Sequence, residues 1–93
     1  MEKYSQLLNV TNEFLHGNIF KIVFEYTDTK DLQLTVQYKY DNKYWFDYDM
    51  NIDMAHEKVD FVSHRSEAKM ESVRLSRDLN FEHAVSDIFF TAK

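Results

Sequence analysis

Residues 44–54, YWFDYDMNIDM, carry the strongest periodic pattern in the chain. Aromatic and aliphatic side chains occupy every even position of this stretch, and polar side chains occupy most of the odd positions. Successive side chains of a β-strand point to opposite faces, so this alternation predicts a strand that is buried on one face. We expect the even-numbered side chains to face the core.

Two earlier stretches, residues 20–27 and 32–40, alternate in the same way. Short polar segments at residues 28–31 and 41–43 separate the three runs, as turns would. Three alternating runs joined by short turns predict an antiparallel meander with one apolar face and one polar face.

The pattern at both ends of the chain has a helical period. Apolar side chains between residues 4 and 15 recur every three or four positions, and Gly17 follows where a left-handed residue would end the helix. Apolar side chains between residues 81 and 89 recur in the same way, with Asp78 or Asn80 available as the N-cap.

Residues 55–79 give mixed signals. Residues 58–63 fit a short strand or a connection, residues 66–71 are good helix formers, and residues 72–76 alternate like a strand. We predict a helix in this region. The resulting fold is α+β, a three-stranded antiparallel β-meander with helices packed on one face, in the order α-β-β-β-α-α.

Length and composition indicate a single domain covering residues 1–93. The chain has no cysteine, which excludes disulfides, thiolate metal sites and thiol catalysis. No apolar run approaches the ~20 residues that span a bilayer, and the first residues do not resemble a secretory signal. We expect a cytoplasmic protein without cofactors or membrane contact.

The net charge of −5 is concentrated in one stretch, because residues 41–60 carry six acidic and two basic side chains. Direct nucleic-acid binding is disfavoured, since phosphate contacts require clustered Lys and Arg. A basic protein surface is the partner that this charge favours.

The predicted third strand aligns Asp47, Asp49, Asn51 and Asp53 on one face, with neighbours about 6.6–6.8 Å apart. Aspartate is a poor strand residue and same-face carboxylates repel, so the pattern indicates charge placed for a partner. Charge that protects a sheet edge from aggregation is the alternative. With an exposed aromatic and a neighbouring acid added, the predicted partner-binding residues are Glu25, Trp45, Asp47, Asp49, Asn51 and Asp53.

Other chemical readings have less support. Residues 49–60 match part of a calcium-binding loop, but Met54 stands where the sharp turn needs glycine. His56, Glu57 and Asp60 could form an acid–base group, but the motifs that accompany such groups are missing. The four histidines are expected at the surface. Basic residues between positions 61 and 77 would form a solvated helix face or complement the acidic strand.

These features favour a non-enzymatic binding module whose acidic face occupies a basic groove of a partner, at the extreme as a DNA mimic. The predicted order α-β-β-β-α-α resembles that of some small anti-CRISPR proteins. That likeness in element order implies an inhibitor of a nuclease, of the anti-restriction kind found in phages and mobile elements. An immunity- or chaperone-type protein for a toxin or effector remains an alternative, as does a small hydrolase or ligand-binding domain using His56, Glu57 and Asp60. We expect a monomer or a weak homodimer, with Phe90 exposed for self-association.

Overall fold

The computed structural model describes residues 2–16, 19–26, 31–40, 43–68 and 71–91. Its elements in chain order are α1 (Glu2–Leu15), β1 (Ile19–Tyr26), β2 (Leu32–Tyr40), β3 (Tyr44–Asp53), β4 (Lys58–Ala68), β5 (Glu71–Arg74) and α2 (Leu79–Phe90). All neighbouring strands pair antiparallel in the order β1-β2-β3-β4-β5. The sheet is thus a meander of four long strands, extended at one edge by the short strand β5.

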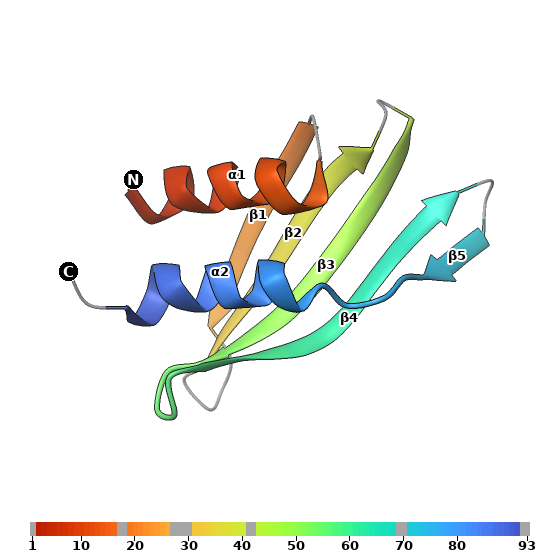
Figure 1. The fold of residues 1–93 in the computed structure, drawn as a ribbon. Helices are drawn as coiled ribbons and strands as arrows, with labels where there is room; N and C mark the ends of the chain where they lie inside the picture. The colour runs from red at the N-terminus through yellow and green to blue at the C-terminus, as the bar shows by residue number, and fades with distance from the viewer. Residues whose placement is uncertain (1, 17–18, 27–30, 41–42, 69–70, 92–93) are drawn as a thin grey trace.

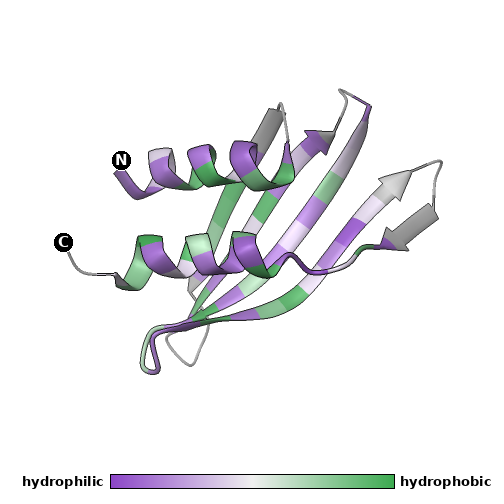
Figure 2. Cartoon of the chain, viewed as in Figure 1, coloured by the Kyte–Doolittle hydropathy of each residue, from purple (hydrophilic) through white to green (hydrophobic). Residues whose placement is uncertain are grey.

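Both helices cover the same face of the sheet and lie side by side, running in opposite directions (Figure 1). The strands show alternating hydrophobic and hydrophilic bands, which is the pattern of a sheet buried on one face (Figure 2). The core forms where the helices meet this face. Neither described helix has the length and hydrophobicity needed to cross a bilayer.

The alternating stretches form the expected strands, and their even-numbered side chains face the helices. The central strands β2 and β3 bury Leu34, Val36, Tyr48, Met50 and Ile52 completely. From the helices, Leu7, Phe81 and Val85 reach the same layer, also without exposure to solvent. The predicted α+β class and meander are therefore confirmed.

The prediction of a helix between residues 55 and 79 is wrong. Residues 58–68 form β4 and residues 71–74 form β5, so the order is α-β-β-β-β-β-α. The expected likeness to small anti-CRISPR proteins depended on an element order with a third helix, so it no longer holds. The described chain has two more strands than expected and one helix fewer.

A β-bulge in β4 explains why its alternation was not recognised. Phe61 pairs with Met50 and Ser63 pairs with Asp49, which leaves Val62 as an extra residue without a register partner. Inward-facing positions are odd before Val62 and even after it. Two of the later inward positions are also polar, so neither a hydrophobic run nor a single period marks the strand.

The helix ends differ in part from the expected ones. α1 ends at Leu15, and His16 itself adopts the left-handed conformation, with a φ of 56°. Gly17, the residue expected in that role, lies outside the described residues. Asp78 caps α2 as predicted, because its side chain accepts a hydrogen bond of 3.1 Å from the Phe81 N–H. Phe90 is partly buried against the core, contrary to the expectation of an exposed ring.

Candidate functional site

The sheet face opposite the helices, which we call the open face, carries most of the predicted site residues. The register assigns the outward positions because residues paired across strands share a face. The open face consists of Lys21, Val23, Glu25, Gln33, Thr35, Gln37, Lys39, Trp45, Asp47, Asp49, Asn51, Asp53, Lys58, Asp60, Ser63, Arg65 and Arg74. No described helix covers this surface (Figure 1).

Charge on the open face is separated into two bands. One row across the strands consists of Glu25, Gln33, Asn51 and Asp60, and Asp49 lies in the next row. We call the three acidic residues Glu25, Asp49 and Asp60 the acidic band. Four residues along the strands from Glu25, another row contains Lys21, Asp47, Arg65 and Arg74. We call its three basic residues the basic band. Five acidic and five basic side chains occupy the described face, so its acidity is local.

Asp49 is held within the sheet by hydrogen bonds to both neighbouring strands. The Thr35 hydroxyl on β2 donates to Oδ1 at 2.7 Å, and the Ser63 hydroxyl on β4 donates to Oδ2 at 2.9 Å. Both bonds are partly buried, and both end on an ionised acceptor, which makes them stronger than neutral ones. Asp49 therefore has a structural role that explains its presence in a strand.

Two other predicted residues also have partners within the chain. The Asp53 carboxylate accepts from the backbone N–H of His56 at 3.1 Å and lies 3.0 Å from His56 Nδ1, which fastens the β3–β4 turn. These contacts, the backbone hydrogen bond first, lower the pKa of Asp53 below its usual value. Asn51 donates to the Asp31 carboxylate at 3.1 Å.

The remaining predicted residues are accessible for contact with a partner. Within the described residues, neither Glu25 nor Asp47 makes a side-chain hydrogen bond or ion pair, and Glu25 is exposed. Trp45 is 45% exposed, with Lys39 Nζ 5.4 Å from the centre of its ring. Trp45 therefore points outward, on the open face.

The acid–base group considered from the sequence is not assembled. His56 contacts Asp53, Asp60 lies 3.7 Å from Lys58 Nζ, and Glu57 is a turn residue with a φ of 54°. His56 is largely exposed and is not enclosed in a cleft of the kind that surrounds catalytic groups. The described part of the chain contains no cluster of three potential metal-ligating side chains.

A buried polar network beneath α2 was not predicted from the sequence. The Tyr48 hydroxyl donates to Glu82 Oε2 at 2.6 Å and accepts from the Asp78 N–H at 2.6 Å. Arg77 forms an ion pair with Glu82, which is only 3% exposed. Burial and the Glu82 contact raise the pKa of Tyr48 above its ordinary value. These bonds anchor the start of α2 to β3.

His64 forms the second part of this network. Its Nδ1 lies 2.8 Å from the Ser76 carbonyl oxygen, which can only accept, so Nδ1 carries the proton. In the neutral ring, Nε2 then accepts from the Tyr38 hydroxyl at 2.7 Å. Burial lowers the pKa of His64. The expectation of a surface histidine is wrong here, because the bulge at Val62 turns position 64 toward Tyr48.

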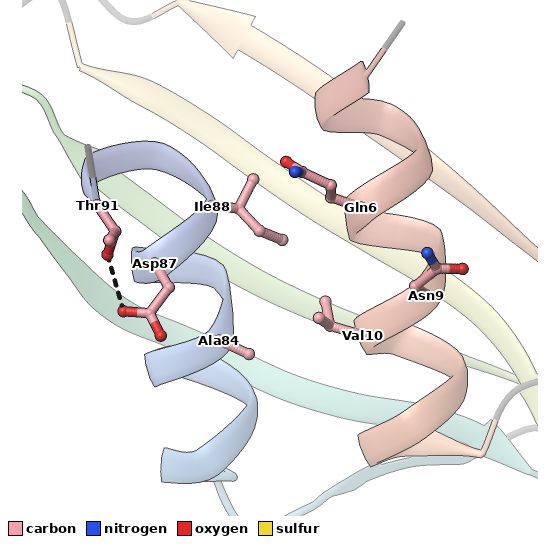
Figure 3. Close-up of a pocket in the computed structure, with 7 residues that line it drawn as sticks. All are labelled: Gln6, Asn9, Val10, Ala84, Asp87, Ile88 and Thr91. Carbon is pink, nitrogen blue, oxygen red and sulfur yellow. Dashed lines mark hydrogen bonds between the residues drawn. The ribbon is translucent and has the colours of Figure 1, made fainter. Parts of the chain in front are cut away.

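The helices form a shallow hollow of about 520 Å³ on the side away from the sheet. Figure 3 shows Gln6 and Val10 of α1 pointing toward Ala84 and Ile88 of α2 across it, and Asn9 also lines the hollow. Its carboxylate, Asp87, accepts a hydrogen bond from the Thr91 hydroxyl at 3.1 Å. The hollow thus combines amide, aliphatic and hydroxyl groups without an acid–base pair suited to catalysis.

The open face is the candidate site because its charged and aromatic groups are accessible, whereas the network under α2 is enclosed. No protein-family model, curated protein or solved structure matches this chain.

Proposed function

We propose that this chain is a non-enzymatic protein-binding module that docks on a partner through its open face. One observation carries the proposal: the uncovered face presents Trp45, 45% exposed, two residues from Asp47, which has no side-chain partner among the described residues. An antiparallel sheet can face water on one side, so an open polar face alone would not be sufficient. An exposed tryptophan beside accessible charges is typical of interface hot spots.

The partner that fits the acidic band is a protein with a basic groove, of the kind that binds nucleic acid. Glu25 and Asp60 lie at opposite ends of this band, and Asp47 provides another carboxylate in the row of the basic band. The chain would then act as an inhibitor that occupies the groove, as DNA mimics of the anti-CRISPR and anti-restriction kind do. Asp49 and Asp53 would stabilise this surface, because Asp49 bonds to both neighbouring strands and Asp53 bonds to the β3–β4 turn.

The basic band gives the interface a defined orientation. Lys21, Arg65 and Arg74 would repel a uniformly basic surface, so the partner must present acidic or polar groups opposite them. Complementary bands allow one docking orientation and penalise the reversed one. The proposed partner surface therefore has a basic zone and a smaller acidic zone side by side.

The test is affinity capture with matched variants. Asp47→Asn/Asp60→Asn removes two charges from the open face, and Glu2→Gln/Glu13→Gln removes two exposed charges from α1 on the opposite side. We expect the wild type and the α1 variant to retain the same protein and the open-face variant to lose it. Retention should also fall between about 0.1 M and 1 M salt, where the Debye length shrinks from about 10 to 3 Å.

The outcome also separates the partner classes. Excess duplex DNA should displace the captured protein if the chain occupies a nucleic-acid groove. A partner that DNA does not displace would instead indicate a toxin or effector neutralised by an immunity-type protein. Equal retention by both double variants would refute docking through the open face.

A further inference from the structure

β1 is a long edge strand whose outer side has no neighbour within the described residues. It has eight residues and pairs with β2 alone. The opposite edge is formed by the four residues of β5 and by the part of β4 that β5 does not pair with. The outer edge of β1 presents a row of backbone N–H and C=O groups, which can template pairing with another strand.

The inward side chains of β1 are incompletely covered. Ile22 and Phe24 remain partly exposed, although their neighbours in β2, Val36 and Leu34, are fully buried. Phe24 packs edge-on against Phe89 of α2, with ring centres 6.3 Å apart. The core thus extends to this edge and ends there with apolar surface that a further strand would cover.

The outward side chains of β1 are complementary to themselves. Lys21 and Glu25 are exposed, and their neighbours in β2 are the uncharged residues Gln37 and Gln33. Four residues of strand separate the two charges by about 13 Å, too far for them to pair with each other. Each charge therefore lacks an opposite partner across the β1–β2 pair.

We propose that two copies of this chain associate through β1, as antiparallel strands in a register centred on Val23. That register places Lys21 of each copy opposite Glu25 of the other, so two symmetric ion pairs form on the open face. On the opposite face it places Ile22 opposite Phe24 of the second copy. A two-fold contact of this kind is isologous and closes as a dimer.

The dimer would be a single continuous sheet. Its two-fold axis runs perpendicular to the sheet at Val23, so the helices of both copies lie on the same side. The open faces of the two copies then form one surface with two acidic bands and two basic bands. The β1 contact shares Lys21 and Glu25 with the two bands of the open face but involves neither Asp47 nor Asp60. The dimer and the proposed function can therefore fail separately, because the capture test changes only Asp47 and Asp60.

Charge reversal tests the register. Lys21→Glu leaves two acids at the edge and Glu25→Lys leaves two bases, so each variant faces like charges when paired with itself. Because an attractive pair becomes a repulsive one twice per dimer, the dissociation constant should rise roughly tenfold or more. An equimolar mixture of the two variants restores both ion pairs and should form a one-to-one heterodimer. Sedimentation equilibrium would measure all three samples.

A thiol at the axis provides a second test. The chain has no cysteine, so Val23→Cys introduces one thiol per copy, and the register places the two thiols opposite each other within disulfide range. We expect this variant to form a covalent dimer on mild oxidation, whereas Gln37→Cys, on β2 away from the edge, should not. A wild type that remains monomeric at about 1 mM would overturn the proposal, as would equal cross-linking of both variants.

Discussion

Replacing Asp49 by alanine should destabilise the fold, although its carboxylate belongs to a charged surface. The substitution removes the acceptor of two hydrogen bonds, from Thr35 at 2.7 Å and from Ser63 at 2.9 Å. Both hydroxyls are held in a sheet, and each loses a partner that water replaces only in part. We expect the free energy of unfolding to fall by about 2 kcal/mol, counting ~1 kcal/mol per bond for a partly buried site.

Asp47→Ala is the matched control for this substitution. It removes the same side chain from the same strand and face, two residues away, where the carboxylate has no partner among the described residues. Its effect on stability should stay within about 0.5 kcal/mol. Urea titrations followed by circular dichroism would give both values, and thermal unfolding should show Asp49→Ala melting roughly 10 °C lower.

A double-mutant cycle would separate the two bonds. Thr35→Val removes one donor, and combining it with Asp49→Ala should cost about 1 kcal/mol less than the sum of the single changes. If the two aspartate variants lose equal stability, or if the cycle shows no coupling, the sheet does not hold Asp49 as described.

The buried network and the β3–β4 turn support three more predictions. Because burial lowers the pKa of His64 below its unfolded value of 6.5, its contribution to stability is complete above that pH and is lost as the pH falls below it. Urea titrations should show a lower free energy of unfolding at pH 5.5 than at pH 7.5, and this difference should be smaller in His64→Gln. The same difference in both proteins would contradict the role of His64. Tyr48→Phe leaves the Asp78 N–H without its acceptor and removes one of the two donors to Glu82 Oε2, the other being Arg77 Nε. The substitution should cost about 1–3 kcal/mol by urea titration, so a neutral result would count against the network. Glu57 has a left-handed backbone conformation, which glycine adopts at lower cost. Glu57→Gly should therefore raise the free energy of unfolding by about 0.5–1 kcal/mol and raise the melting temperature with it. A lower melting temperature would show that the backbone at Glu57 is not strained.

The sequence predicted those parts of the fold in which local pattern and tertiary environment agree. Strict alternation in residues 44–54 identified β3 because both of its neighbours continue the same two faces. Asp78 was found as an N-cap because capping depends on residues within one turn of the helix. Such features need only short-range information.

The features that were missed depend on long-range pairing. The hydrogen bonds of Asp49 join residues 14 positions away in both directions, and only the register brings them together. Charge balance on the open face has the same origin, since β4 and β5 bring Arg65 and Arg74 beside an acidic strand. The burial of His64 requires the bulge, for which the sequence offers no clear signal.

The bulge also gives β4 one residue more than its partner strand requires. If Val62 were absent, Phe61 would still oppose Met50 and Ser63 would still oppose Asp49, in an unbroken ladder. The strand would lose the local bend and added twist that an extra residue imposes. A deletion of Val62 would therefore leave the strand pairing unchanged. A deletion after Ser63 would shift the register of the remaining pairs by one residue, so that each following side chain of β4 would point to the opposite face.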